Sequence, residues 1–465
     1  MTQAPPEQST KQRHNRYPMV AFEHYMLADD RPSHSMVVQM RFWFSGNFKK
    51  DAFIDAIKQI LIRHPIFQMR LHGHAGKKSS DIFWEHDANL CMPFISWGGM
   101  DEPISHPSKL THIDLTSEIG LRLWMRDNSA QNPRPDDART HMLVQFHHSV
   151  CDGVGMLQFI EDLLIHYGQT MAFETPSPRN LDHSLFEQRG NFSLTPLQWR
   201  QRRFRDFKRS FKFFAALAQP LAVPKHQKGQ KSQIADLFAA ERRILPASTL
   251  INIRNTARIK NATVNDILIH ELFRTLSPWN QRFGKILNKV RIGLATSLRT
   301  PSEAAMSAVN IVSMVFLDKS HRQVTKSCLL EDITEETRDI KTNRMGVTLP
   351  RVIRFFGRAP LLVKAFLRFP LCSATAVLSN LGNTLSKSPL MAQDGKLRIG
   401  NISLDSYELM PPVRPKTSVS FAINYYAGNL SVTIRYDSTR LTAETAKNLL
   451  DQYCIRLESL EIATD

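Results

Sequence analysis

One stretch of the chain combines two periodicities that restrict the fold more than any other feature. In residues 140–148, THMLVQFHH, successive side chains alternate as they do on a β-strand, and an Asp-Gly pair follows at Asp152 and Gly153. Residues 156–168, MLQFIEDLLIHYG, then carry apolar side chains at helical spacing and end in a glycine. The sequence therefore predicts a strand, a tight turn and a helix in direct succession, which favours an α/β fold.

Two adjacent histidines, His147 and His148, end the predicted strand. Neighbouring side chains on a strand point to opposite faces, so the pair is unsuited to holding one metal ion, and no third ligand follows nearby. One of them is a candidate reactive base, while Asp152 lies where a carboxylate stabilises the start of a helix. The alternative is a buried structural histidine beside a helix cap. Against it, the whole pattern H-H-x-x-x-D-G arises by chance in about one chain of this length in a thousand.

Length, charge and cysteine content limit the classes of function. A chain of 465 residues predicts two domains. Its net charge of +17 suits nucleic acid, an anionic membrane surface or a phosphate-bearing cofactor or carrier protein. Because no zinc-finger, basic-zipper or RNA-binding signature accompanies the charge, we expect no nucleic acid. Five scattered cysteines without a CxxC pair, and no signal sequence, predict the cytoplasm.

Local patterns divide the chain into four parts. We expect a mobile tail at 1–18, a first domain at 19–190, a basic aromatic connector at 191–240 and a second domain at 241–465. Strands are expected at 35–45, 81–85, 140–147, 289–298, 310–318 and 372–380, helices after Asn47, Thr263 and Ser327, a hairpin around Gly428-Asn429, and a terminal helix capped by Thr442.

Basic and aromatic residues are combined twice, in the connector and in the run at 351–370. Such runs are usually solvated or core-facing helices. Together they also allow peripheral membrane contact or the approach of an apolar acceptor.

Several motifs, taken in order, resemble one known superfamily. HHSVCDG at 147–153 resembles the HHxxxDG motif of the CoA-dependent acyltransferases, which include condensation domains of peptide synthetases, alcohol O-acetyltransferases and wax-ester synthases. VAFEHYM at 20–26, RHPIFQMRL at 63–71, ATVNDILIHEL at 262–272 and AVLSNLG at 376–382 resemble further segments of that group. The DFGWG motif of its plant branch is absent.

This resemblance implies a fold and a base. The fold class is α/β (α+β), with two chloramphenicol-acetyltransferase-like domains, each a mixed sheet with flanking helices, and an active-site tunnel at their interface. His148 is implied as the general base that takes a proton from the attacking acceptor. His147 and Gly153 are implied to support the motif, with Gly153 allowing close backbone approach.

The resemblance also implies structural roles. Asp152 is expected to pair with an arginine and hold the loop in shape, and the candidate partners are Arg63, Arg70, Arg291 and Arg299. Three further residues, Asn310, Asn380 and Gly382, are candidates to bind pantetheine or steady an oxyanion, unless they only end strands. Cys151 is not expected to act as a nucleophile.

The predicted function is transfer of an acyl group from a CoA or carrier-protein thioester to a hydroxyl, including that of a lipid or long-chain alcohol. No bound cofactor or metal is expected, since the acyl-CoA or phosphopantetheinyl thioester is a co-substrate. Two alternatives stay open. One is a condensation enzyme that joins carrier-bound substrates by an amide or ester bond, and the other is a catalytically silent interaction protein that keeps the fold.

Overall fold

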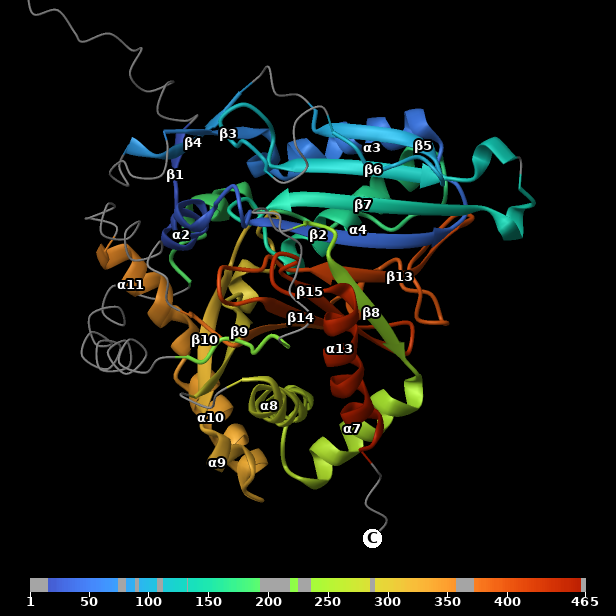
Figure 1. The fold of residues 1–465 in the computed structure, drawn as a ribbon. Helices are drawn as coiled ribbons and strands as arrows, with labels where there is room; N and C mark the ends of the chain where they lie inside the picture. Colours follow the sequence, from blue (N-terminus) through green and yellow to red (C-terminus); the bar gives the residue numbers. More distant parts are fainter. Residues whose placement is uncertain are drawn as a thin grey trace, which may run out of the picture.

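Two six-stranded mixed sheets, one in each half of the molecule, form the framework of the protein (Figure 1). The computed structural model describes residues 16–73, 81–87, 92–106, 112–131, 133–192, 218–224, 236–284, 289–356 and 372–460. The fold class predicted from the sequence is confirmed.

The first lobe is built on a sheet with the strand order β12-β13-β2-β7-β6-β5, antiparallel except for the β5–β6 pair. Its strands are β2 (Val37–Ser45), β5 (Phe94–Gly99), β6 (Leu121–Asp127), β7 (Arg139–His147), β12 (Arg398–Ile399) and β13 (Ile402–Met410). Two helices, α3 (Lys50–Arg63) and α4 (Gly153–Thr170), pack against each other and share one apolar core with the sheet. The predictions of β2, α3, β7 and α4 are thereby confirmed.

A small antiparallel sheet of order β1-β4-β3 and one short helix complete this lobe. These elements are β1 (Arg16–Pro18), β3 (Met69–His72), β4 (Phe83–His86) and α2 (Ala21–Asp29). Glu23 of α2 is buried and pairs with Arg189, with 2.7 Å between Glu23 Oε1 and Arg189 Nε, so α2 is fixed to the body of the lobe.

The second lobe is built on a sheet with the strand order β10-β9-β11-β14-β15-β8. Its strands are β8 (Ala240–Leu245), β9 (Val290–Ser297), β10 (Val312–Lys319), β11 (Ala376–Gly382), β14 (Val419–Tyr426) and β15 (Asn429–Tyr436). The predicted hairpin is confirmed as β14–β15, with Gly428 at φ +79° in the turn, a value that glycine adopts without steric cost.

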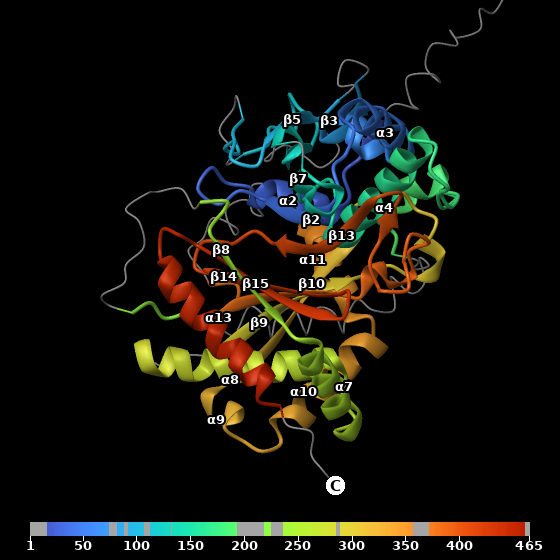
Figure 2. The ribbon, with the colours of Figure 1, turned by 90° about the vertical axis from the view of Figure 1, so that its right-hand side faces the viewer.

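Helices cover the second sheet on the side away from the first lobe (Figure 2). They are α7 (Ala247–Ile259), α8 (Val264–Phe283), α9 (His321–Val324), α10 (Leu329–Thr342) and α13 (Ala443–Glu458). A further helix, α11 (Thr348–Phe356), instead packs against α2 of the first lobe. At the start of α8, Thr263 and Asp266 form a capping box, and Thr442 caps α13 as expected. The apolar faces of α7, α8, α10 and α13 form one core with this sheet.

Two strands from the second half of the chain belong to the sheet of the first lobe. β12 and β13 leave the second lobe and extend the first sheet, with β13 antiparallel to β2. The segment predicted as a second domain, residues 241–465, therefore gives two strands to the first lobe. Strand pairing satisfies the backbone of β2, which would otherwise be an exposed edge.

The basic aromatic runs lie largely outside the described residues. The parts outside are 193–217 and 225–235 of the predicted connector and 357–370 of the second run, while 351–356 of that run belong to α11. Among the described helices, none combines the length and apolar character that crossing a bilayer requires.

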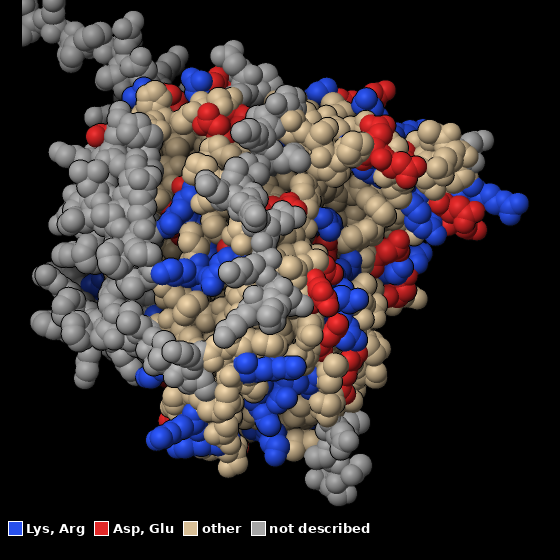
Figure 3. All heavy atoms as spheres, in the orientation of Figure 1, with Lys and Arg blue, Asp and Glu red and all other residues tan. Residues whose placement is uncertain are grey.

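Charge is unevenly spread over the surface drawn in Figure 3. Lysines and arginines gather at the lower end of the second lobe, whereas opposite charges alternate along the edge formed by β8, β13 and α13. Arg243 on that edge lies between Asp451 and Glu458, at 3.3 and 3.4 Å. The uneven distribution favours anionic partners at the second lobe.

Candidate active site

His148 lies just past the end of β7, in the turn that leads to α4. Its Nδ1 is 3.2 Å from the carbonyl oxygen of Cys151. A carbonyl oxygen only accepts hydrogen bonds, so Nδ1 carries the proton in this contact. Nε2 then holds the lone pair of the neutral ring, and within the described residues it has no hydrogen-bond partner. The ring is thus set up to accept a proton at Nε2.

The surroundings of His148 keep its imidazole neutral. Burial lowers the pKa of His148 below the ordinary histidine value, and the negative charge of Asp152 acts in the opposite direction. A neutral imidazole near physiological pH is the form that acts as a general base.

Asp152 begins α4 and makes three contacts that fix the turn. Its Oδ1 accepts the N–H of Gly155 at 2.8 Å, which caps the helix. Its Oδ2 accepts from Nη1 of Arg299 and from the N–H of Ile311, both at 2.7 Å. Both of the latter donors belong to the segment between β9 and β10, so Asp152 ties α4 to the second lobe.

Arg299 is therefore the one of the four candidate arginines that contacts Asp152. Arg70 pairs with Asp87 at 3.0 Å, and Arg291 pairs with Asp318 at 2.5 Å.

The fourth arginine belongs to a separate buried cluster. Arg63 lies 3.2 Å from Asp162. The adjacent His64 is also 3.1 Å from Asp162, and its Nδ1 accepts the N–H of Ala308 at 3.0 Å. The RHP segment thus forms a second link between the lobes.

The segment that precedes β10, residues 306–311, packs onto the first lobe and carries Asn310. The side-chain amide of Asn310 donates to the backbone carbonyl of His148, and its Oδ1 accepts the N–H of Val312 at 3.2 Å. Asn310 thus fixes the backbone of His148, and both of its side-chain groups are used in these contacts.

Two glycines at the start of α4 allow close packing. A Cβ at Gly153 would lie 3.1 Å from the side chain of Leu381, in β11 of the second lobe. A Cβ at Gly155 would lie 2.7 Å from Sγ of Cys151 and 2.8 Å from the carbonyl oxygen of Val309. Gly155 was not among the residues selected from the sequence, although its spacing from Asp152 is that of a capped helix start.

Asn380 and Gly382 lie at the end of β11. The side chain of Asn380 donates to Asn265 at 3.3 Å and accepts the N–H of Gly382 at 2.8 Å. Gly382 has φ +58°, a left-handed conformation that favours glycine. Asn380 also lines a cavity of about 550 Å³.

This cavity lies between the start of α8, the ends of β9 and β11, and α10. Four cationic side chains are among its lining residues, Arg299, Arg338, Lys341 and Arg344. His148 is not in its lining, but Arg299 both lines the cavity and holds Asp152. The cavity is thereby connected to the turn that carries His148.

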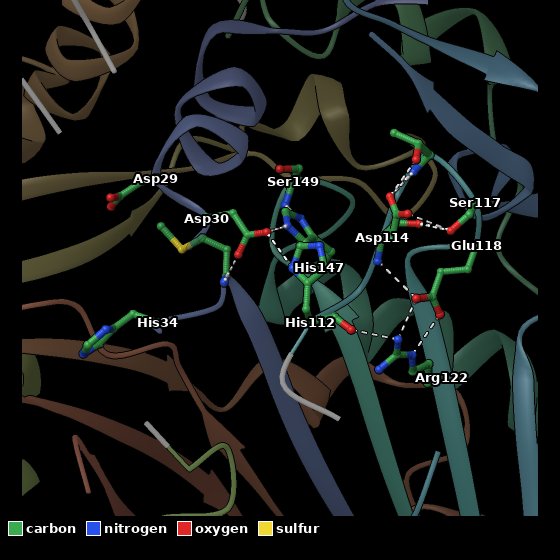
Figure 4. Close-up of polar contacts among 12 residues, drawn as sticks. Asp29, Asp30, His34, His112, Asp114, Ser117, Glu118, Arg122, His147 and Ser149 are labelled. Carbon is green, nitrogen blue, oxygen red and sulfur yellow. Dashed lines mark hydrogen bonds and ion pairs between the residues drawn. The ribbon is translucent and has the colours of Figure 1, made fainter. Parts of the chain in front are cut away.

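His147, the first histidine of the pair, lies between Ser149 and Asp30 (Figure 4). Its Nδ1 accepts the N–H of Ser149 at 3.1 Å, and its Nε2 faces Oδ2 of Asp30 at 3.5 Å. His112 approaches the same carboxylate oxygen at 3.1 Å. Apart from Met36, the partners of Asp30 are far away in the chain, so no local sequence pattern indicates its contacts with the histidines.

Hydrogen bonding keeps Asp30 ionised. Burial by itself would raise the pKa of Asp30, but the contacts with His112, with the His147 ring and with the N–H of Met36 outweigh it and hold that pKa below its usual range. The bond to Asp30 correspondingly raises the pKa of His112.

Cys151 is buried against the second lobe. Burial raises the pKa of its thiol well above the ordinary value, which disfavours the nucleophilic thiolate. Within the described part of the chain, no group of three or more His, Cys, Asp or Glu side chains is placed to hold a metal ion.

The sequence matches the family model described as "Condensation domain" over residues 24–348. The chain belongs to the condensation-domain family. A search of curated proteins gave no match. This condensation-domain chain is also similar in fold to several solved structures.

Three of these structures cover nearly the whole chain. Trichothecene 15-O-acetyltransferase from Fusarium sporotrichioides has 10% identity and a TM-score of 0.67, covering 96% of each chain. The starter condensation domain of rhizomide synthetase, solved with C8-CoA, has 11% identity and a TM-score of 0.65, covering 99% of this chain and 100% of that one. The epimerization domain from the third module of tyrocidine synthetase B has 14% identity and a TM-score of 0.63, covering 96% and 97%. These similarities establish the condensation-domain fold.

Proposed function

We propose that this condensation-family protein is an acyltransferase that moves an acyl group from a CoA or carrier-protein thioester to a hydroxyl acceptor. The observation that carries the proposal is the state of His148, whose Nδ1 donates to the Cys151 carbonyl while Nε2 is left to accept a proton. Membership of the family and the acyltransferase and acyl-CoA complex among similar structures support the same chemistry.

The reaction follows from the position of that lone pair. Nε2 of His148 takes the proton of the acceptor hydroxyl as its oxygen bonds to the thioester carbonyl carbon. The C–S bond then breaks, and the thiolate leaves with the proton returned by Nε2. The Cys151 carbonyl stabilises the transient imidazolium through Nδ1–H. The product is an ester and a free thiol.

The cationic cavity supports a phosphate-bearing donor. Arg338, Lys341 and Arg344 line it together with Arg299, and the phosphates of CoA or phosphopantetheine bring the complementary charge. Ion pairs with these phosphates would hold the donor, and His148, which is outside the cavity lining, would carry out the proton transfer.

The proposed acceptor is a class of compounds and not one named compound. A hydroxyl on a lipid or long-chain alcohol is the predicted class, with peripheral membrane contact as one route to it. An amine on a carrier-bound substrate would use the same base, which makes amide condensation the alternative activity. A silent protein that keeps the fold is the second alternative.

The test is acceptor-dependent thiol release from acyl-CoAs of short to long chain, with alcohols and amines offered as mixed acceptors. The His148→Ala variant is run beside the wild type, and His141→Ala, on the exposed end of β7, serves as the matched histidine control. We expect release from the wild type and the control, and its loss in His148→Ala.

Release that persists in His148→Ala would contradict the assignment of the base. Release with amines alone would favour the condensation alternative. No release with CoA donors, followed by none with carrier-bound donors, would favour the silent protein.

A further inference from the structure

We infer that Asp30 is a positioning residue for His148, holding the base from two sides through groups that do not touch substrate. This inference rests on the proposed role of His148 in acyl transfer. Asp30 follows α2 at the start of the chain and lies beside the end of β7 (Figure 4).

The first connection runs through the backbone of one residue, Met36. Oδ1 of Asp30 accepts the N–H of Met36 at 2.8 Å, and the carbonyl of Met36 accepts the N–H of His148, also at 2.8 Å. The carboxylate therefore fixes the residue that determines the position of the His148 backbone. A hydrogen bond to an ionised acceptor is stronger than one between neutral groups.

The second connection runs through the neighbouring ring. Ser149 donates its N–H to Nδ1 of His147, so the proton of that ring is on Nε2, which faces Oδ2 of Asp30 at 3.5 Å. At this length the contact is mainly electrostatic. It orients the His147 ring, and that ring in turn holds the backbone that leaves His148.

These contacts assign opposite tautomers to adjacent histidines. His148 carries its proton on Nδ1 because it donates to Cys151, whereas His147 carries its proton on Nε2 because it faces Asp30. By fixing His147, Asp30 leaves Nε2 of His148 available to accept a proton. The side chain of Asp30 is 6% exposed, so the carboxylate acts from within the fold.

Asp29 offers a matched control. Its side chain is 7% exposed, and it pairs with Arg31 at 3.0 Å and with Arg414 at 2.6 Å. Neither of these ion pairs involves His148 or Met36. Substitution of Asp29 therefore measures the general cost of losing a buried carboxylate at this end of α2.

The kinetic experiment compares Asp30→Ala, Asp30→Asn and Asp29→Asn in the thiol-release assay, with kcat and KM determined separately. We expect Asp30→Ala to lose about 10- to 100-fold in kcat at nearly constant KM, since small displacements of a reacting group cost this much. Asp30→Asn retains an acceptor for Met36 and should lose less. Asp29→Asn should keep the wild-type kcat. A wild-type kcat in Asp30→Ala, or an equal loss in Asp29→Asn, would overturn the inference.

The connection through His147 is tested by a double-mutant cycle. His147→Asn retains an amide oxygen near the position of Nδ1 but no longer reaches Asp30. If Asp30 acts partly through this ring, the loss in the double variant Asp30→Ala/His147→Asn will be smaller than the product of the two single losses. Simple multiplication of the losses would remove this half of the inference.

A spectroscopic measurement, which needs no catalytic turnover, tests the positioning role of Asp30 independently of the proposed acyl transfer. In ¹⁵N-histidine NMR spectra, we expect the Nδ1–H tautomer at His148 and the Nε2–H tautomer at His147, with signals assigned by His148→Ala and His147→Asn. Asp30→Ala should change the His148 signals, and Asp29→Asn should not. An inactive wild type with this pattern would reject the acyl-transfer proposal and keep the positioning role. Unchanged His148 signals in Asp30→Ala would reject the positioning role even in an active enzyme.

Discussion

Arg299 of the second lobe donates to Oδ2 of Asp152 at 2.7 Å, and its other terminal nitrogen donates to the carbonyl of Val309 at 2.8 Å. Asp152 in turn caps α4 and accepts the N–H of Ile311. One ion pair therefore sets the position of the turn that carries His148 relative to the opposite lobe. The family motif depends on a residue that lies far outside it in the sequence.

Removal of Arg299 is expected to lower both stability and activity. Arg299→Ala leaves the Asp152 carboxylate, 4% exposed, without its ion-pair partner, and breaking a buried pair from one side costs about 3 kcal/mol. Urea denaturation and thiol release measure the two effects. Arg398→Ala removes an exposed arginine that pairs with Asp394 and should change stability by less than about 0.5 kcal/mol. Equal stability of both variants would contradict a stabilising role for the Arg299–Asp152 pair.

The pH dependence of kcat/KM should report the neutral form of His148. Protonation removes the lone pair on Nε2, so the rate falls as pH falls through the pKa of His148. Because burial lowers this pKa, we expect the midpoint below the ordinary value of 6.5.

The Asp152 carboxylate raises the pKa of His148, so Asp152→Asn should move this midpoint to still lower pH. Asp394→Asn, at an exposed site, should leave the profile unchanged. A midpoint that moves upward in Asp152→Asn would contradict the electrostatic assignment.

Gly155 should tolerate no side chain. In Gly155→Ala the new Cβ would lie 2.7 Å from Sγ of Cys151 and 2.8 Å from the Val309 carbonyl, and overpacking of this kind costs about 1–3 kcal/mol. Gly99→Ala is the control, since its nearest contact beyond the chain neighbours would be 3.9 Å away. Thermal unfolding should separate the two variants, and equal melting temperatures would show that the packing at Gly155 can relax.

Cys151 should be dispensable for turnover. Its thiol is buried and its pKa is raised, so Cys151→Ala is expected to keep kcat within a factor of about three, less than 1 kcal/mol in barrier height. Alkylation of the wild type should modify the exposed Cys328 before the buried Cys151. Loss of turnover in Cys151→Ala, with the fold intact by circular dichroism, would point to a covalent acyl-cysteine step.

Local patterns were sufficient for much of the fold. The strand that ends in His147, the helix after Asp152 and the Thr442 cap depend on neighbours within a few residues, and each was predicted. The second-lobe helix that starts after Thr263 was found for the same reason, because its capping box is contained in four residues.

Such local patterns do not predict which residues far apart in sequence contact each other. Four arginines were equally plausible partners of Asp152, and only the packing of residues 306–311 on the first lobe distinguishes Arg299. Asp30 was missed because Met36 is its only nearby partner in sequence, while His112 and His147 approach it through tertiary structure. The transfer of β13 to the first sheet likewise has no local signature.

The pairing of β13 with β2 has a consequence for how the molecule is made. Ser45 and Asp405, which share a hydrogen bond of 2.7 Å at this seam, are 360 residues apart in sequence. Closing so large a loop is slow, and it cannot begin on the ribosome until residue 405 has left the exit tunnel. The first sheet therefore completes its strand order late in synthesis, and a nascent chain that already contains both histidines still lacks a finished lobe around them.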